Sequence, residues 1–194
     1  MATTLILVRH AVHGLVDRVL CGRSPSVHLS EEGRQQAVLL GQRLRPLRPA
    51  AVYSSPLARA QETAVCIGPP TIADSLNEID FGDWNGCEFS TLRDDLDWRR
   101  WNAERGSARP PGGESMREAQ VRAMRWALDA AGRHADATIV AVSHCDIIRA
   151  MVCAVLGLSL DHFACFEVSP ASCTTITLWR GGASVLRMNE GVAT

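Results

Sequence analysis

The stretch from Thr4 to His10 reads TLILVRH, an apolar run that stops at an arginine and a histidine. Its apolar residues do not alternate with polar ones, which is typical of a strand buried on both faces of a parallel sheet. The same pattern returns at residues 138–144, TIVAVSH, which also end at a histidine. Two buried strands that end in polar side chains predict an α/β sheet with a site at its carboxyl edge.

Helical segments alternate with further short strands along the chain, which predicts parallel strand connections. The last two strands surround Gly181 and Gly182, a hairpin turn, and predict an antiparallel ending. We therefore expect an α/β fold, a three-layer α/β/α sandwich with a mostly parallel central sheet, in one domain spanning residues 1–194. The expected helices are residues 29–47, 55–68, 113–133 and 146–157, and the expected further strands are residues 50–55, 70–74, 172–179 and 183–188.

Three polar residues and one proline mark the expected helix starts. Ser30 is the expected N-cap of the first helix, because acidic residues follow it and favour the positive helix end. Ser55 is the expected N-cap of the second helix, with Pro56 at its first helical position, which places Arg59 in the first turn. Asp146 is expected to cap the helix that follows the second buried strand.

The charge composition limits what the chain can bind. The formal net charge is −1, and all 20 basic residues are arginine. A nearly neutral chain has no general attraction for nucleic acid or anionic membranes, so we expect neither as a partner. Without lysine, Schiff-base chemistry and a P-loop lysine are excluded, and guanidinium is the only strong cation for binding an oxyanion.

The seven cysteines form an odd set without a C-x-x-C pair. This spacing indicates neither a disulfide framework nor a zinc site, so we expect reduced, mostly buried thiols. The N-terminal apolar run is too short for a signal peptide, and no later segment reaches membrane-spanning length without charges. The sequence therefore predicts a cytoplasmic location.

Four cationic or imidazole side chains follow strands at strand-to-helix junctions: Arg9, His10, Arg59 and His144. In an open α/β sheet these junctions share one edge, so we expect the four side chains to converge although they are far apart in sequence. Guanidinium groups match phosphate oxygens, and free N–H groups at a helix start supply further donors. A single histidine at a strand end is more often structural, but four such residues together predict a phosphate site that needs no metal.

Five motifs in order resemble the histidine phosphatase superfamily, the group that includes cofactor-dependent phosphoglycerate mutases and many small bacterial phosphatases. The resemblance covers nearly the whole chain and implies a phosphoglycerate mutase-like fold. Its signatures stand here as RHA at residues 9–11, LSEEGRQQA at 29–37, SSPLARAQETA at 54–64, LNEIDFGDWNG at 76–86 and VSHCDIIRA at 142–150.

The resemblance implies a phosphatase that needs no metal and no cofactor and acts on a small phosphate ester such as a sugar phosphate, phosphoglycerate, nucleotide or ribazole phosphate. It implies that His10 is the nucleophile, that Arg9, Arg59 and His144 bind the phosphoryl oxygens, and that Glu78 is the proton donor. His10 must then be unprotonated on its attacking nitrogen, whereas His144 helps most when it donates a hydrogen bond or carries charge, so we expect their environments to differ. Glu78 must be protonated near neutral pH, which requires a raised pKa.

The chain departs from the family pattern at three positions, Ala11, Val16 and Cys145, the last of which replaces the glycine that commonly follows the second histidine. Ala11 replaces the usual glycine, so either φ is negative there or the turn tolerates a methyl group beside the phosphate. Val16 stands where several relatives carry an asparagine that reaches the phosphate, and Arg23 is a candidate to replace that contact. A solvated loop arginine is the equal alternative for Arg23. His13 is a further candidate for substrate binding.

Other clusters have simpler interpretations. Cys145 beside His144 could suggest a thiol nucleophile, but no glycine-rich cradle surrounds it, so we expect it to pack at the helix start. The acidic residues of the segment 91–106 alternate with arginines, which favours salt bridges over a Mg²⁺ site. Trp98 and Trp101 are expected to seat this segment on the core, and a lid over the site is a second interpretation. The acidic residues concerned are Asp94, Asp95 and Asp97.

Two other functions stay open at this stage. A mutase needs extra segments to enclose a bisphosphate, and this chain has little room for them. A phosphate-binding protein without turnover would normally lack the nucleophile or the acid, and both are present here. The antiparallel C-terminal strands could also pair edge to edge in a homodimer.

Overall fold

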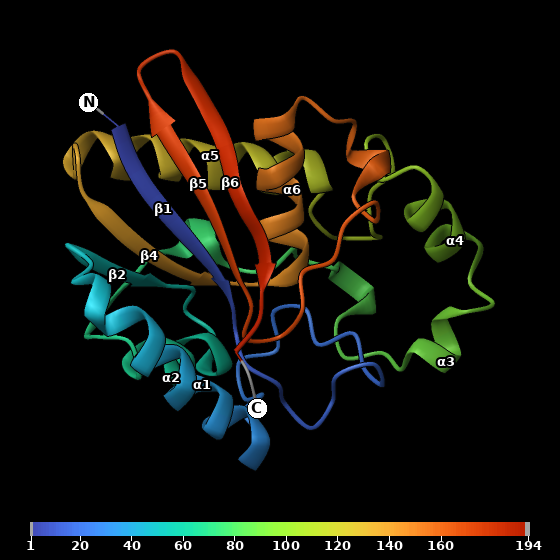
Figure 1. Ribbon diagram of the computed structural model, residues 1–194. Coiled ribbons are helices and arrows are strands. Elements are labelled where there is room, and N and C mark those ends of the chain that lie inside the picture. The colour runs from blue at the N-terminus through green and yellow to red at the C-terminus, as the bar shows by residue number, and fades with distance from the viewer. Residues whose placement is uncertain (1, 193–194) are drawn as a thin grey trace.

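One six-stranded sheet forms the centre of the computed structural model, which describes residues 2–192 (Figure 1). Its strand order is β3-β2-β4-β1-β5-β6, with the first four strands parallel and the last two antiparallel to their neighbours. This arrangement confirms the expected mostly parallel sheet and the hairpin at Gly181 and Gly182. The strands are β1 (Ala2–Arg9), β2 (Ala51–Ser54), β3 (Pro70–Ile72), β4 (Thr138–Ser143), β5 (Cys173–Trp179) and β6 (Gly182–Glu190).

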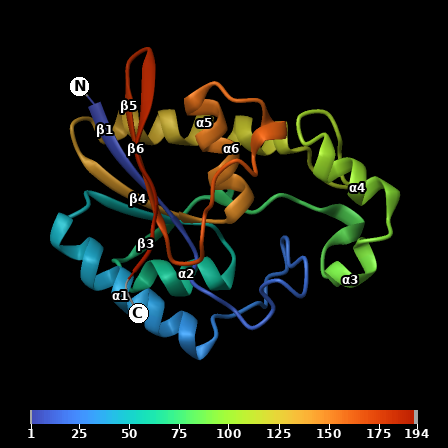
Figure 2. The ribbon, with the colours of Figure 1, turned by 45° about the vertical axis from the view of Figure 1, so that its right-hand side comes forward.

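Helices cover both faces of the sheet, which confirms the three-layer sandwich (Figures 1 and 2). Helices α1 (Glu31–Leu44) and α2 (Ala58–Val65) pack on one face, and α5 (Met116–Arg133) and α6 (Cys145–Leu156) pack on the other. The short helices α3 (Phe89–Leu92) and α4 (Leu96–Ala103) project beyond the sheet edge, as the green segment of Figure 2 shows. Within residues 2–192, no helix combines the length and apolarity needed to cross a bilayer. Single 3₁₀ turns occupy Arg45–Leu47, Asp74–Leu76, Gly82–Trp84 and Leu160–His162.

Strands β1 and β4 lie side by side in the middle of the sheet and end at the same level. Their apolar side chains are fully buried between the two helical layers, as the uninterrupted apolar runs predict. The register pairs Arg9 with Ser143, and the backbone N–H of His10 donates to the carbonyl of Ser143 at 3.0 Å. The residues that follow the two strands, His10 and His144, therefore leave the sheet at adjacent points.

The expected helix caps were partly wrong. Ser30 caps α1, because its Oγ accepts from the backbone N–H of Gly33 at 3.1 Å. Helix α2 starts later than expected, with Leu57 as its N-cap, so Ser55 and Pro56 precede it. Helix α6 begins directly after His144, so Asp146 lies inside the first turn instead of capping it. In both cases the polar side chain forms a contact within the site described below in place of the cap.

The segment 87–108 is attached to the core through its tryptophans. Trp101 is fully buried and lies 6.2 Å from the ring of Phe81, edge to face, and Trp98 lies 5.3 Å from the ring of Trp84. These contacts confirm that the tryptophans seat the segment. Asp94 pairs with Arg99, which agrees with the salt-bridge interpretation, whereas Asp95 caps α4 instead.

Replacing Gly33 by alanine is expected to destabilise the protein by about 1–3 kcal/mol. A Cβ at Gly33 would lie 1.9 Å from the carbonyl oxygen of Val12, a backbone atom in the loop after His10. Gly132 is the matched control, because a Cβ there meets nothing within 4 Å. Gly132→Ala is expected to be neutral or to stabilise the helix by up to about 1 kcal/mol. Urea unfolding measures both variants, and equal midpoints for Gly33→Ala and wild type would contradict this account.

Candidate active site

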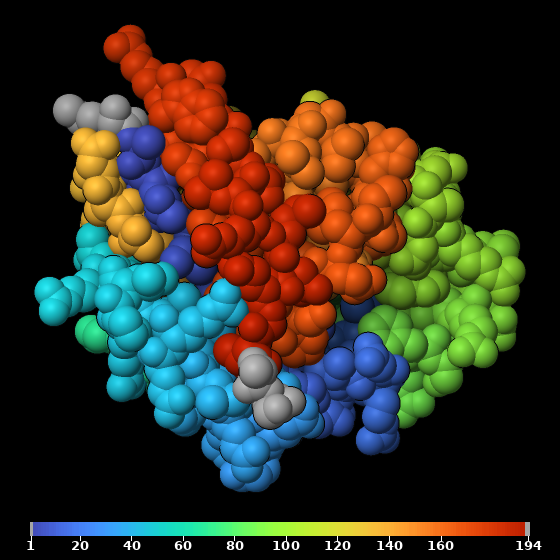
Figure 3. Space-filling model, in the orientation of Figure 1, coloured from blue at the N-terminus to red at the C-terminus, as the bar shows by residue number. Residues whose placement is uncertain are grey.

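A cavity of about 490 Å³ opens at the carboxyl edge of the parallel strands. Three segments form it: the loop after β1, the region from Glu78 to α4, and the region from α6 to residue 167. Figure 3 shows the surface hollowed where these blue, green and orange segments meet. Its lining residues include Arg9, His10, His13, Val16, Asp17, Cys21, Arg59, Glu78, Asn102, Arg105, Cys145, Asp146, Arg149, Phe163 and Glu167.

The His10 ring is held with one nitrogen toward its own backbone and the other toward Arg59. Nδ1–H donates to the carbonyl of Ala11 at 2.8 Å, and Nε2 accepts from Nε of Arg59 at 3.3 Å. Burial, followed by the charge of Arg59, lowers the pKa of His10 well below its ordinary value. His10 is therefore neutral, with the lone pair on Nε2.

Arg59 lies in the first turn of α2, as the sequence predicts, and joins both histidines. Its side chain is almost fully buried. Its Nη2 donates to the carbonyl of Gly22 at 2.7 Å and its Nη1 donates to that of Ser24 at 3.2 Å. These backbone acceptors come from the loop after β1, so the loop fixes the plane of the guanidinium and directs it at the two imidazoles.

His144 is fully buried, and its ring centroid lies 5.1 Å from that of His10. Nδ1 faces Nη2 of Arg59 at 3.4 Å, which can only donate, so Nε2 carries the proton and donates to Oγ of Ser55 at 2.7 Å. Burial and Arg59 lower the pKa of His144 well below its ordinary value as well. Of the two expected alternatives for His144, the structure shows the hydrogen-bond donor: both rings are neutral, and their environments differ in their hydrogen-bond partners.

Arg9 places a second guanidinium at the cavity. Its Nη1 donates to the carbonyl of Val168 at 2.7 Å. Its Nε is buried and has no hydrogen-bond partner among residues 2–192. Arg9 and Arg59 thus supply two cations beside the two imidazoles, and no carboxylate of the described chain pairs with either of them. An oxyanion can be bound there by charge-assisted hydrogen bonds.

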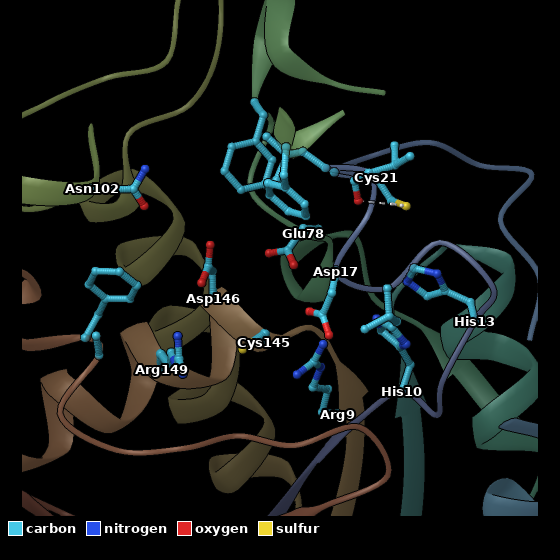
Figure 4. A pocket seen from close by; sticks show the side chains of 18 of the residues that line it. Arg9, His10, His13, Asp17, Cys21, Glu78, Asn102, Cys145, Asp146 and Arg149 are labelled. Carbon is cyan, nitrogen blue, oxygen red and sulfur yellow. Dashed lines mark hydrogen bonds between the residues drawn. The ribbon is translucent and has the colours of Figure 1, made fainter. Parts of the chain in front are cut away.

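Glu78 faces the same cavity from the loop before the Gly82–Trp84 turn (Figure 4). Its Oε1 accepts from the backbone N–H of Ile79 at 2.9 Å. Burial, and next the charge of Asp146, raise the pKa of Glu78 to about 7. The raised pKa that the sequence analysis required is confirmed, so a substantial fraction of Glu78 is protonated at neutral pH.

Arg23 does not line the cavity. Its Nε donates to the carbonyl of Glu78 at 2.9 Å, its Nη2 donates to Oε2 of Glu114 at 3.0 Å, and its Nη1 lies 3.5 Å from Asp80. Its guanidinium is thus committed to the loop that holds Glu78 and does not replace the polar contact that Val16 lacks. Arg23 thus holds the backbone of Glu78 from outside the cavity, and a role in substrate binding stays a prediction.

His13 does line the cavity. It is buried and stacks on His10, with ring centroids 5.4 Å apart. Burial lowers the pKa of His13 to about 4, so its ring is neutral. Its Nδ1 accepts from the backbone N–H of Leu15 at 3.3 Å. Nε2 stays available to a ligand.

The departures from the family pattern fit the structure. Ala11 is fully buried with negative φ, and its backbone N–H donates to Oγ1 of Thr63 at 3.1 Å. Of the two alternatives for Ala11, the one with a negative φ is therefore confirmed. Cys145 packs at the start of α6, with Sγ 3.6 Å from the carbonyl of Val168, and burial raises its pKa to about 11. A thiol protonated to that extent is a poor nucleophile.

The residues on the far side of the cavity were not predicted from the sequence. Asp146 and Arg149 lie on α6, in the first two turns after His144, so helical spacing from that histidine could have placed them. Arg105 and Phe163 come from irregular segments whose positions depend on tertiary packing, and no sequence pattern indicates them. Ser55, expected as a helix cap, is the partner of His144 instead.

Comparisons with known proteins agree with the site. A model of the histidine phosphatase superfamily (branch 1) matches residues 5–191. The phosphoserine phosphatase 1 of Hydrogenobacter thermophilus is 34% identical, over 95% of this chain and 91% of that protein. A 2,3-bisphosphoglycerate-dependent phosphoglycerate mutase of Brucella melitensis is 32% identical, over 84% and 85%. The structure of a mycobacterial glucosyl-3-phosphoglycerate phosphatase superposes with a TM-score of 0.88 at 25% identity, covering 98% of this chain and 100% of the other.

Proposed function

The chain belongs to the histidine phosphatase superfamily, and we propose that it hydrolyses small phosphate monoesters through a phosphohistidine on His10. The observation that carries the proposal is the tautomer of His10. Nδ1–H is fixed on the carbonyl of Ala11, so the lone pair of Nε2 lies at the cavity beside Arg59. A neutral imidazole nitrogen held among cations is suited to attack phosphorus.

In the first step, Nε2 of His10 forms a bond to phosphorus while the bond from phosphorus to the alcohol oxygen breaks. Arg9 and Arg59 bind the equatorial oxygens, and His144 lies beside them, so the charge that spreads over these oxygens is stabilised. The carboxylic acid of Glu78 gives its proton to the departing alkoxide. The products of this step are the free alcohol and the phosphorylated enzyme.

In the second step, a water molecule attacks the phosphorus, and the N–P bond breaks. The carboxylate of Glu78 takes a proton from that water, which restores the acid for the next turnover. Inorganic phosphate leaves, and His10 returns to its neutral form. The proposal includes no metal and no cofactor, because the protein cations supply the positive charge.

Hydrolysis of a panel of about fifty phosphomonoesters tests this function, with EDTA present and absent, by release of inorganic phosphate. The proposal expects turnover of at least one small metabolite at the same rate in both conditions. Relatives are named for phosphoserine, phosphoglycerate and glucosyl-3-phosphoglycerate, so these esters belong in the panel with sugar phosphates, nucleotides and ribazole phosphate. The absence of any turnover, or a requirement for added divalent metal, would overturn the proposal.

Activity is expected to fall as the pH rises above about 7. Glu78 must be protonated to act as the acid, and its pKa is raised to about 7, so the acid form is lost above that pH. The pKa of His10 lies well below its ordinary value, so the nucleophile stays active into the acid range. The measurement is kcat/KM from pH 5 to 9.

The Glu78→Gln variant is the control for this pH dependence. With an alcohol that needs protonation, the variant is expected to be about 100-fold slower. With p-nitrophenyl phosphate, whose leaving group departs as an anion, the loss is expected to be far smaller. An unchanged alkaline limb in Glu78→Gln would show that another group is the acid.

A phosphoglycerate mutase is the second candidate, because relatives that cover most of this chain carry that name. Isomerisation of a phosphoglycerate after priming with 2,3-bisphosphoglycerate would favour it over hydrolysis. A phosphate-binding protein without turnover is a weaker alternative, because His10 and Glu78 are both present at the cavity. Tight binding of phosphate without any hydrolysis would support that alternative.

Three further expectations stay predictions: a single domain over residues 1–194, a cytoplasmic location and a homodimer. For the homodimer, β6 forms an edge of the sheet and pairs only with β5 within residues 2–192. Its outer backbone edge can pair with a second copy. The proposed partner in catalysis is the phosphate ester itself.

A further inference from the structure

The cavity has two ends, and a phosphate ester must occupy both. Figure 4 shows Arg9, His10 and His13 at one end and Asp146, Arg149 and Asn102 at the other, with Glu78 between them. If phosphorus lies at His10 and Glu78 protonates the leaving oxygen, the remainder of the alcohol extends toward Asp146 and Arg149. The inference that follows therefore rests on the proposed function.

Arg105, at the far end, is held by the protein itself through both terminal nitrogens, and only its Nε lacks a partner in the described part of the chain. Its Nη1 lies 3.1 Å from Oδ2 of Asp146, and its Nη2 donates to Oδ1 of Asn102 at 2.8 Å. Its guanidinium is sandwiched between rings, 4.6 Å from the centroid of Trp101 and 4.0 Å from that of Phe163. A buried guanidinium held by an acid, an amide and two rings has a structural role.

Arg149 differs because neither of its terminal nitrogens makes a hydrogen bond within the described part of the chain. Its side chain is only 15% exposed, and its Nε is buried without a hydrogen-bond partner in the described part of the chain. Its one ion pair there is with Glu167, at 3.6 Å, and that carboxylate is 76% exposed. An exposed, loosely placed partner contributes little, whereas an unmade hydrogen bond on a buried guanidinium is costly. Arg149 therefore presents an unsatisfied cation to the cavity.

We propose that Arg149 binds a carboxylate on the leaving alcohol, so that the preferred substrates are phosphate monoesters of small hydroxy acids, O-phospho amino acids among them. A carboxylate matches the fork of a guanidinium and can take two parallel hydrogen bonds. One face of the guanidinium is already set by the Phe163 ring, 5.6 Å away. The edge of the Arg149 guanidinium that carries the terminal N–H groups is therefore left for the carboxylate of the ligand.

The acids around Arg149 determine which anion fits. Asp146 and Glu167 also line the cavity at this end, and each already has an arginine partner, Arg105 and Arg149 respectively. A second phosphate, with up to two negative charges, would be repelled by these two acids, whereas a single carboxylate matches the single charge of Arg149, whose partner Glu167 is mostly exposed. Asp146 uses Oδ2 for Arg105, and its other oxygen can accept a hydrogen bond from a hydroxyl or ammonium group beside that carboxylate.

Two matched substrate pairs test the proposal. O-phosphoserine and O-phosphoethanolamine differ only by a carboxylate, and 3-phosphoglycerate and glycerol 3-phosphate differ by a carboxylate in place of a hydroxymethyl group. We expect the carboxylate member of at least one pair to have about 10- to 100-fold higher kcat/KM in the wild type. The pair that shows the preference also tells which group the site accepts beside the carboxylate: an amino group in the phosphoserine pair or a hydroxyl group in the phosphoglycerate pair.

The Arg149→Gln variant should reduce that ratio to nearly one by slowing only the carboxylate member. Arg149→Lys keeps the charge and should retain part of the preference. Arg125→Gln, an exposed arginine on α5 away from the cavity, is the control and should leave the ratio unchanged. No preference in the wild type, or a full preference in Arg149→Gln, would overturn the proposal.

Binding separates this proposal from the proposed function. In the His10→Ala variant, calorimetry compares the same pairs as ligands without turnover. Tighter binding of the carboxylate member supports the role of Arg149 even if none of the four esters is hydrolysed, and equal binding contradicts it. If p-nitrophenyl phosphate is hydrolysed but neither matched pair shows a preference for its carboxylate member, the proposed phosphatase function is retained and only the role of Arg149 is refuted.

Discussion

The His10→Ala variant is expected to lose at least about 10⁴-fold in kcat. The methyl group of alanine offers no lone pair to phosphorus, and neither of the two nearby imidazoles takes the place of the His10 ring. The Nε2 of His144 is committed to Ser55, and the ring of His13 lies 5.4 Å away, stacked on the missing one. The phosphate clamp stays in place, because Arg59 keeps its contacts with the carbonyls of Gly22 and Ser24.

Steady-state phosphate release measures this loss, and calorimetry with inorganic phosphate verifies that binding is retained. The matched control is His28→Ala, which removes an exposed histidine whose partner is Glu62 on the surface of the protein. Its activity is expected to equal that of the wild type. Activity of His10→Ala within about tenfold of the wild type would mean that another group attacks phosphorus.

Replacing Arg59 by lysine is expected to reduce kcat/KM by about 10³-fold. Arg59 uses three nitrogens at once, toward His10, Gly22 and Ser24. An ammonium on a flexible stem cannot direct donors to all three places, so the loop after β1 loosens and the phosphoryl oxygens lose a planar, two-pronged donor.

The measurement for Arg59→Lys is kcat/KM together with the inhibition constant of inorganic phosphate. As kcat/KM falls, the inhibition constant is expected to rise, because phosphate binds more weakly. Arg48→Lys, at an exposed position after α1, is the control and should change neither. Because Arg59 is buried, thermal unfolding of the variant accompanies the kinetics and verifies that it is folded. An unchanged inhibition constant would show that Arg59 does not bind the phosphate.

The convergence of the phosphate site could be predicted from the sequence because it follows from chain topology. His10 and His144 each follow a buried strand. When two neighbouring strands are parallel, the residues that follow them lie side by side at the same edge of the sheet. Arg59 lies in the first turn of a helix that starts at the same edge. These positions depend on strand order and helix phase, which apolar patterning largely determines.

The contacts within the site could not be predicted, because each polar side chain has several possible hydrogen-bond partners, and the tertiary structure determines which one it contacts. Ser55 is a good helix cap by type, yet it lies within reach of His144 and bonds that ring instead. Asp146 likewise pairs with Arg105, a residue from a distant irregular segment. Arg23 shows the same limit, since only the folded loop reveals that its guanidinium holds the backbone of Glu78.

The most direct test of the account is detection of the phosphoenzyme. Wild-type protein is mixed with a hydrolysed phosphate ester, quenched in alkali within milliseconds, and digested for mass spectrometry at neutral or alkaline pH, because a phosphohistidine is labile in acid. The account predicts one phosphoryl group on the peptide that contains His10, stable to base, lost in acid and absent from His10→Ala. Turnover without any phosphorylated histidine, or a label on His13 or His144, would contradict it.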